Sequence, residues 1–450
     1  MQSRPSLSRR LRGSVLIIVL WICLGVVALT LYFANAMSSE LRAAENRAAT
    51  IAARLAVSGG ERYGAYVLAN DITPGGVPDP NSTDAGFNYQ AEAQPVGEAA
   101  FWFIGRDPNL VATANPVFGL VDESSKLNLN TATPAMLQSL PNMTPDLATA
   151  ILTWRSAGGT DAGSNYSTLN PPRLNKVTPF ESVDELRLVF GATLELLLGE
   201  DTNRNGALES NEDDGDQSSP RDNQDGQLQP GLLEYVTVYS ALPNTRADGS
   251  PRVDVRTPQG RADLQPLLER QLGATRATEV LDRLGQANLG SVAEFLARSG
   301  LSAGEFAQIH TDITASAGAS ARGLVNVNTA GATVLTCLPG IGAANAAAIV
   351  AYRRANPTAL TSFAWLPQVI GPAAFIQAGP FITDQSYQFS ADVVAVGRNG
   401  RGYCREKVVF DLSRGTPRIV YRQDLSAYGW ALGSSVRQNL YQARNPDHAS

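Results

Sequence analysis

Residues 201–212 are the stretch of this sequence whose residue types and spacing could do chemistry. Oxygen-bearing side chains recur along it, and Gly206 at the sixth position permits the sharp turn that a metal-binding loop needs. The expected ligands are the side chains at positions 1, 3, 5 and 12, the carbonyl at position 7 and a water-mediated contact at position 9: Asp201, Asn203, Asn205, Glu212, Ala207 and Glu209. Carboxylate and carbonyl oxygens at this spacing predict a calcium site.

The charge around this loop favours a bound cation. Residues 200–225 contain nine acids and two arginines, so the segment would repel itself without one. Residues 222–228 repeat part of the pattern, but Arg221 and Leu232 stand where the first and last ligands belong, so a second ion near residues 222–234 is an open alternative. No long helical pattern flanks the loops, which indicates a structural clamp and not a sensor switch.

The composition disfavours an enzyme and a nucleic-acid binder. The 450 residues include only two histidines, His310 and His448, and no persuasive nucleophile elbow, phosphate-binding loop or histidine metal motif. With 42 acidic and 36 basic residues the net charge is −6, which disfavours a phosphate-binding surface. Of the three cysteines, Cys23 is an apolar filler, while Cys337 and Cys404 form either a disulfide or two buried thiols.

The elements that position the loop begin with a membrane-spanning segment. Residues 1–13 contain four arginines and no acid, and residues 15–36 are 22 residues without a charge, which is long enough to cross a bilayer. The arginines hold their end in the cytoplasm, so the rest of the chain lies across the membrane. Three interpretations are open: a secretory signal cleaved near residues 34–36, an uncleaved anchor, or a leader cleaved after Gly13.

The helix should continue beyond the membrane until about residue 58. Apolar residues recur at spacings of three and four along it, which predicts a packing seam: Leu41, Ala44, Ala48, Ile51 and Leu55. Ser58, Gly59 and Gly60 then interrupt the pattern. We interpret the helix as lying on its own domain, an arrangement that is compatible with packing against other subunits.

An internal repeat dominates the middle of the chain. Residues 127–155 align without gaps to residues 325–353 with eleven of 29 positions identical, and a fainter copy begins at Val253. Each copy predicts an extended entry, a short helix, a tight turn at a proline and a second helix that ends near an arginine. Residues 338–342 are typical of a helix-hairpin-helix turn. Further helical pieces near residues 182–186 and 291–295 would complete the modules.

Helix-hairpin-helix turns bind either DNA or protein. In DNA binders, glycine backbone N–H groups approach a phosphate. Here the copy at residues 127–155 has Asn142, Met143 and Thr144 in place of the glycines. The copy at residues 325–353 enters its helix with Ala343, Ala344 and Asn345, where DNA binders carry Lys or Arg. We therefore expect protein-interaction modules and regard nucleic acid as an unlikely partner, although a membrane-anchored helix-hairpin-helix DNA receptor is the alternative function.

Short strands are predicted on both sides of the modules. Residues 100–104 and 117–121 come before them, and residues 387–393, 408–412 and 419–421 come after, with a turn at Asn399-Gly400. Residues 70–98 are rich in Pro, Gly, Asn and Asp and predict a surface loop. The later strands should complete the sheet begun by the earlier ones.

The amino terminus carries a family resemblance. A short basic leader that ends in Gly13 and directly abuts the apolar helix at Ser14 resembles the class III leader of type IV pilins and type II secretion pseudopilins. Most members carry Glu at the fifth mature residue, where this chain has Ile18. That departure narrows the resemblance to the K-type minor pseudopilins (general secretion pathway protein K family), which lack this Glu. Residues 126–131 are also similar to that family's entry into its inserted helical domain.

The resemblance implies an α+β fold: a long N-terminal membrane-spanning helix and a pilin-like α/β head with a large inserted helical (helix-hairpin-helix/SAM-like) domain. The expected boundaries are 1–13 for the leader, 14–58 for the helix, 59–125 for the first part of the head, 126–379 for the inserted modules with the calcium loop at 200–234, and 380–450 for the C-terminal strands. Residues 156–320 are longer and more divergent than the family leads us to expect.

The resemblance also implies a role. Prepilin peptidase would cut between Gly13 and Ser14, and the new N-terminus would be methylated. The protein would span the bacterial inner membrane once, with its head in the periplasm, and would assemble with the I-type and J-type minor pseudopilins and the major pseudopilin. It would form part of the tip of the pseudopilus in type II secretion, supporting protein export across the outer membrane, and would not be an enzyme.

Overall fold

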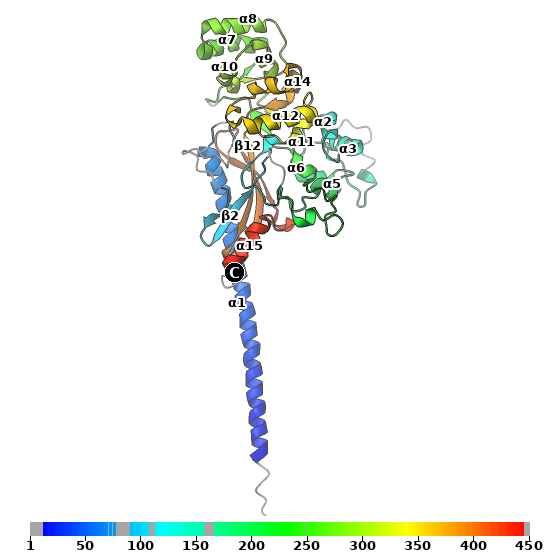
Figure 1. Ribbon diagram of the computed structural model, residues 1–450, viewed down its shortest axis with the longest axis vertical. Coiled ribbons are helices and arrows are strands. Elements are labelled where there is room, and N and C mark those ends of the chain that lie inside the picture. The colour runs from blue at the N-terminus through cyan, green and yellow to red at the C-terminus, as the bar shows by residue number, and fades with distance from the viewer. Residues whose placement is uncertain are drawn as a thin grey trace, which may run out of the picture.

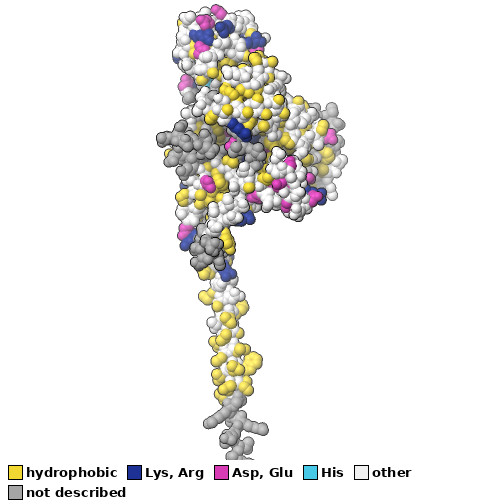
Figure 2. All heavy atoms as spheres, in the orientation of Figure 1, with side chains coloured by type: hydrophobic (Ala, Val, Ile, Leu, Met, Phe, Trp, Pro, Cys, Tyr) yellow, Lys and Arg dark blue, Asp and Glu magenta, His cyan; other side chains and the backbone are white. Residues whose placement is uncertain are grey.

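A single long helix begins the described part of the chain, and the head is built around its second half. The computed structural model describes residues 12–70, 72–73, 75–77, 91–107, 113–156, 166–246 and 248–444. Helix α1 (Arg12–Asn70) protrudes from the head over its first half, where apolar side chains cover its surface (Figures 1 and 2). This half is long and apolar enough to be a candidate membrane anchor. Residues 1–11 of the predicted leader lie outside the described residues, whereas Gly13 and Ser14 belong to the first turn of α1.

The predicted end of this helix at residue 58 is wrong, because α1 continues through Gly59 and Gly60 to Asn70. These glycines lie where the helix crosses the sheet of the head. A Cβ atom on Gly60 would stand 2.6 Å from Cγ1 of Val393 and 3.1 Å from Cδ2 of Phe101. Glycine is therefore required by close approach of helix and sheet, and its helix-weakening effect is offset by packing.

The head contains one antiparallel sheet whose strands come from both sides of the inserted modules. Its strand order is β1 (Gln94–Val96), β2 (Ala99–Ile104), β12 (Gln388–Val396), β13 (Tyr403–Asp411) and β14 (Arg418–Asp424), and β3 (Val121–Asp122) also pairs with β12. Central β12 is buried on both faces: α1 covers one, and the segment leading into α15 (Gly433–Arg444) covers the other. The α+β fold with a long N-terminal helix and a helical insertion is confirmed.

Two of the strand and loop predictions need correction. Residues 94–96 form β1, so the predicted surface loop at residues 70–98 is wrong there, because Gln94 to Val96 pair antiparallel with β2. Residues 71, 74 and 78–90 of that loop lie outside the described residues. In the predicted strand at residues 117–121, Phe118 makes only an isolated bridge to Ile104, and pairing with β12 begins at Val121.

The inserted region consists of three copies of one supersecondary unit. In each, a two-residue strand leads into a helix pair and is later joined by a parallel strand: β4 (Leu127–Asn128) with β5 (Val236–Thr237), β7 (Val253–Asp254) with β8 (Ile313–Thr314), and β10 (Val325–Asn326) with β11 (Ile382–Thr383). The helix pairs are α2 (Pro134–Gln138) and α3 (Pro145–Arg155), α7 (Pro258–Leu272) and α8 (Ala274–Leu284), and α11 (Ala332–Thr336) and α12 (Gly342–Ala355). The second copy, which is faint in sequence, is structurally complete.

Further short helices close each unit. They are α5 (Leu194–Leu198) and α6 (Leu232–Tyr235) in the first, α9 (Val292–Ser299) and α10 (Ala303–Ala307) in the second, and α13 (Leu366–Ile370) and α14 (Pro372–Ala378) in the third. The helical piece predicted near residue 182 is the 3-10 helix Val183–Leu188, and the one near residue 291 is α9. An antiparallel pair of β6 (Ala241–Pro243) and β9 (Ser320–Arg322) flanks the second module in the chain.

The arginine shared by the first and third copies has a structural role. Arg155 donates to the backbone carbonyls of Leu129 and Ala132, and Arg353 Nη1 donates to the carbonyl of Val327 at 2.9 Å. Leu129 and Val327 occupy equivalent places just after their strands. The arginine therefore ties the second helix of each pair back to the extended entry, which satisfies carbonyls that would otherwise be buried without a donor.

We predict that Gly60→Val destabilises the head. The added side chain overlaps Val393 and Phe101, so the free energy of unfolding should fall by about 1–3 kcal/mol in chemical denaturation of the full chain in detergent. Ser58→Val on the exposed face of the same helix is the matched control and should change it by less than about 0.5 kcal/mol. Equal effects of the two substitutions would contradict close packing at Gly60.

Candidate metal centre

The predicted calcium loop lies between α5 and α6 of the first module, and an isolated bridge between Gly199 and Pro230 closes its base. Its side chains fold the backbone around one centre. The Asp201 carboxylate accepts hydrogen bonds from the backbone N–H groups of Asn205 and Gly206, each at 2.9 Å, and Asn205 Oδ1 accepts from Ala207 N at 2.8 Å. Gly206 has φ +71°, the left-handed conformation that its place in the pattern requires.

The second half of the loop returns to the same centre. Glu209 accepts from the side-chain amides of Asn203 at 3.1 Å and Asn205 at 3.3 Å, and Glu212 Oε2 accepts from Glu209 N at 3.0 Å. Hydrogen bonds within the loop thus link all six residues predicted from the sequence. A 3-10 turn, Ser210–Glu212, carries the last carboxylate inward.

This centre holds more negative charge than its surroundings balance. Burial raises the pKa of Asp201 and of Glu209, and burial reinforced by the carboxylates of Asp201 and Glu209 raises the pKa of Glu212 to about 8. Glu212 is only 1% exposed, and its Oε1 is buried without a hydrogen-bond partner among the described residues. An orphaned buried carboxylate oxygen in a loop of oxygen ligands fits a bound divalent cation.

The ligand set would have to include amide and carbonyl oxygens. In the part of the chain that the structure describes, no three His, Cys, Asp or Glu side chains converge closely enough to hold a metal by themselves. A cation here would therefore depend on Asn203, Asn205 and the Ala207 carbonyl as well as on carboxylates. That mixture of hard oxygen ligands suits Ca²⁺ better than a transition metal.

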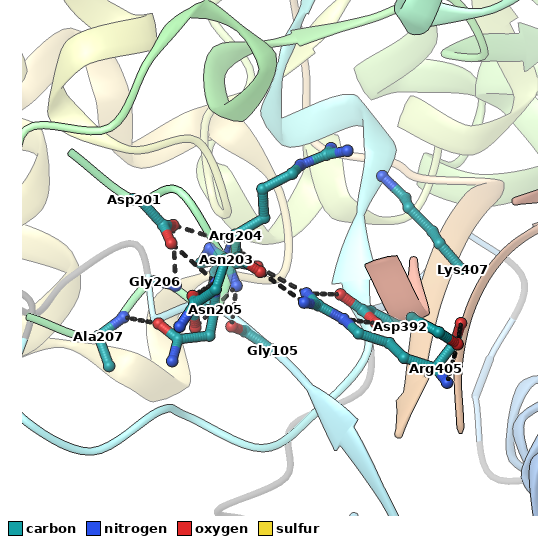
Figure 3. A network of polar contacts seen from close by, with 12 residues as sticks. Gly105, Asp201, Asn203, Arg204, Asn205, Gly206, Ala207, Asp392, Arg405 and Lys407 are labelled. Carbon is teal, nitrogen blue, oxygen red and sulfur yellow. Dashed lines mark hydrogen bonds and ion pairs between the residues drawn. The ribbon is translucent and has the colours of Figure 1, made fainter. Parts of the chain in front are cut away.

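Two arginines that the sequence analysis did not single out anchor this loop to the sheet. Arg405 on β13 is 1% exposed; its Nη1 donates to the Asn203 carbonyl and its Nη2 to the Arg204 carbonyl at 2.9 Å (Figure 3). The same guanidinium forms a two-pronged ion pair with Asp392 on β12, at 2.9 Å and 2.6 Å. Burial alone would raise the pKa of Asp392, but Arg405 outweighs it and lowers that pKa.

Arg106, just after β2, holds the loop from the other side. It donates to the Arg204 carbonyl at 3.1 Å and the Asn205 carbonyl at 3.3 Å, and it pairs with both carboxylate oxygens of Glu234 on α6, at 2.7 Å and 3.0 Å. It lies 3.8 Å from Asp201 Oδ2. Two guanidinium groups from the sheet region therefore donate hydrogen bonds to the loop backbone, and each also pairs with its own acid.

The only sequence signal for these anchors is an arginine within an apolar strand pattern. Arg405 precedes Val408 to Phe410 and is followed directly by Glu406, yet it pairs with Asp392 on the neighbouring strand, so this partner and the loop carbonyls are visible only after folding. Arg106 is separated from Glu234 by 128 residues. Long-range pairing of this kind leaves no periodic trace.

The disulfide alternative for Cys337 and Cys404 is wrong, because both are free thiols. Cys337 is buried in the third module, where its Sγ contacts the Thr333 carbonyl at 3.3 Å, and Cys404 lies on β13 near the carbonyl of Thr50 on α1.

In the second acidic segment, the Asp222 carboxylate accepts hydrogen bonds from the backbone N–H groups of Asp214, Gly215 and Gln224. The second ion near residues 222–234 stays a prediction.

Comparison with known proteins locates one family motif. Residues 320–383 match the helix-hairpin-helix motif, which covers the third module and confirms the motif predicted at residues 338–342. No curated protein matches the chain. Among solved structures, the chain is similar to one in the crystal structure of the GspK-GspI-GspJ complex from the type 2 secretion system of enterotoxigenic Escherichia coli, with a TM-score of 0.34 and 10% identity over 87% of this chain and 98% of that chain.

We predict that Arg405→Met destabilises the head strongly. It leaves the Asp392 carboxylate and two loop carbonyls without their donor, so the free energy of unfolding should fall by about 3–5 kcal/mol in chemical denaturation. Adding Asp392→Asn should restore part of that loss, because the buried charge is removed. Arg398→Met, which removes an exposed arginine paired with exposed Glu98, is the control and should cost less than about 1 kcal/mol. A small, control-sized effect of Arg405→Met would contradict the anchoring.

Proposed function

We propose that this protein is a K-type minor pseudopilin of a type II secretion system, a structural subunit of the pseudopilus tip that supports protein export across the outer membrane. The observation that carries this proposal is the division of α1 into two halves. Its first half exposes apolar side chains all round, as a membrane anchor does, and its second half packs against the sheet of the head. The proposal includes inner-membrane anchoring with a periplasmic head, which this arrangement and the basic residues before the helix support.

The face of α1 beyond the membrane supports assembly with other helices. The stripe of Leu41, Ile51 and Leu55 points away from the protein's own sheet, and Leu55 remains 63% exposed. Small residues on the opposite face, Ala53 and Ala56, make the contact with the sheet instead. An exposed apolar stripe at this spacing suits a subunit whose helix packs against those of the I-type and J-type minor pseudopilins and the major pseudopilin.

The N-terminal chemistry supports a tip position. Cleavage by prepilin peptidase between Gly13 and Ser14 would place Ile18 at the fifth mature residue. An apolar residue there offers no carboxylate to the N-terminal amine of a subunit stacked beyond it, so nothing compensates that charge in the apolar core of a fibre. Methylation of the new amine belongs to the same proposal.

The helix-hairpin-helix modules are better suited to protein packing than to the alternative DNA-receptor function. In the third module, a Cβ atom on Gly340 would meet the Ala374 carbonyl of α14 at 2.8 Å, so this glycine serves helix packing. The first turn of α12 begins with Gly342, Ala343 and Ala344 and contributes no positive side chain. A phosphate would gain little from such a surface.

Calcium, we further propose, stabilises the head through the loop at residues 201–212. The ligands would be the side chains of Asp201, Asn203, Asn205 and Glu212, the Ala207 carbonyl and Glu209 through water. A divalent cation would neutralise carboxylates that are buried with little compensation, and the two anchoring arginines would transmit the order of the loop to β12 and β13. The role is structural and involves no catalysis.

Processing of the N-terminus tests the proposed function. Mass spectrometry of the protein expressed with prepilin peptidase should give a mature chain that starts at Ser14, and expression without the peptidase should give the uncut chain. Gly13→Leu should block cleavage, whereas Gly25→Leu, in the same helix with open space around it, should not. A peptidase-independent start near residue 37, or an intact leader with active peptidase, would reject the pseudopilin proposal.

Calcium binding should appear as a rise in stability. At 100 times the dissociation constant, calcium should add about 2.7 kcal/mol to the free energy of unfolding, measured against a chelator. Glu212→Gln should abolish most of this gain, because it removes the buried bidentate carboxylate. Asp216→Asn changes an exposed acid outside the ligand set and should retain the gain. If both variants respond to calcium like the wild type, the loop does not bind it.

A further inference from the structure

A cavity of about 220 Å³ lies where the second and third modules meet the antiparallel pair of β6 and β9. Its wall includes residues at the start of α9, those just after α14, and strands β8 and β11. Figure 1 shows α9 and α14 in the upper half of the head. The calcium loop and α1 contribute nothing to its lining. It is thus a second candidate site, separate from the metal centre.

A buried arginine without a counter-ion lines this cavity. Arg252 is 6% exposed, and its guanidinium donates only to neutral groups: Nε to the Thr245 carbonyl at 3.3 Å, and Nη2 to Gln385 Oε1 at 2.9 Å and the Tyr387 hydroxyl at 3.1 Å. Its Nη1 is buried and has no partner among the described residues. Burial lowers the pKa of Arg252, but a guanidinium keeps its proton in a protein.

The nearest acids are committed elsewhere. Asp312 lies 3.6 Å from Arg246 and 3.6 Å from Arg270, and Asp384 accepts a hydrogen bond from Phe363 N at 2.9 Å and faces His310 Nε2 at 3.9 Å. Neither comes within ion-pair distance of Arg252 in the described part of the chain. A buried cation in this situation is destabilising unless an anion joins it.

The rest of the lining is mixed: Asp384, which faces His310, and several hydroxyl groups share it with an apolar wall that would suit a hydrocarbon group. Apolar side chains from several elements of the second and third modules and from β6 contribute carbon surface to the wall: Leu242, Val292, Ile313, Leu324, Phe363 and Ile382. Arg322 at the end of β9 also lines the cavity and is exposed, so it adds positive charge on the solvent side. A fixed cation beside an apolar wall is the combination that selects a carboxylate with a compact hydrocarbon body.

We propose that this cavity is a binding site for a small carboxylate with an apolar body, in which Arg252 supplies the counter-ion through Nη1 and the wall around Phe363 and Ile382 holds the hydrocarbon. Because Arg252 has three neutral contacts that fix its guanidinium, the site is preorganised for the ligand. Binding would also fasten the second module to the third, since the lining comes from both.

The test uses the full chain in lipid nanodiscs and chloride-free buffer, with isovalerate as the probe and isovaleramide as its neutral counterpart. Calorimetric titration should show saturable binding of isovalerate, corrected for empty nanodiscs, and at least about tenfold weaker binding of the amide. Arg252→Gln should lower the affinity for isovalerate by at least about tenfold. Arg414→Gln, which replaces an arginine outside the lining, should change that affinity by less than about twofold.

Ala315→Phe keeps Arg252 and fills the cavity, so it should also abolish binding, which guards against misfolding of the arginine variant. Both variants are compared after chemical denaturation has shown a cooperative unfolding transition. The proposal is overturned if isovalerate does not saturate the wild type, if the amide binds equally well, if chloride or inorganic phosphate binds with no preference for isovalerate, or if a folded Arg252→Gln variant keeps wild-type affinity.

Discussion

The buried ion pair between Arg405 and Asp392 is the interaction on which the rest of the head depends. It joins the two central strands β12 and β13, and the same guanidinium holds the backbone carbonyls of the candidate calcium loop. A charge pair in this environment is costly to separate, because each partner would be left buried alone. A loop inserted in a helical module is thereby tied to strands that come about 200 residues later in the chain.

The insertion of three modules poses a topological problem that a second buried acid addresses. Asp122 on β3 accepts hydrogen bonds from the hydroxyl groups of Thr329 in the third module and Ser386 at the entry to β12, and from Ser124 N. The chain leaves the sheet after β3 and returns to it at β12. The exit from the sheet after β3 and the return to it at β12 are therefore joined through the Asp122 carboxylate, so the insertion begins and ends at neighbouring places in the sheet. Burial, only partly opposed by these donors, raises the pKa of Asp122 to about 6.

The three modules share a fold because they share a way of satisfying backbone groups. Each begins and ends in a two-residue parallel pair, and the arginine of the first and third copies reaches back to carbonyls beyond the strand. The second module keeps the strands and helices with little of the sequence, since its core requires only apolar residues such as Leu264, Leu268 and Val280 at buried positions. Between the modules, such packing leaves a cavity in which Arg252 lacks a counter-ion.

The sequence by itself determined those features that local patterns encode. Uncharged length defined the anchor, repetition defined the first and third modules, and the spacing of Asp201 to Glu212 defined the loop, because each depends on residues close together in the chain. Tertiary structure decided what depends on distant partners. Gly60 breaks a helix pattern in sequence, yet the helix continues because the glycine is needed against Val393. The apolar stripe at Leu55 faces away from its own head. Arg405 and Arg106 acquired their roles through acids more than ten positions away, whereas Arg252 acquired its role because no acid comes within ion-pair distance of it in the described part of the chain. Periodicity reports which residues are apolar on one face, while the choice of partner for that face, or for a buried charge, is made by the packing of the whole chain.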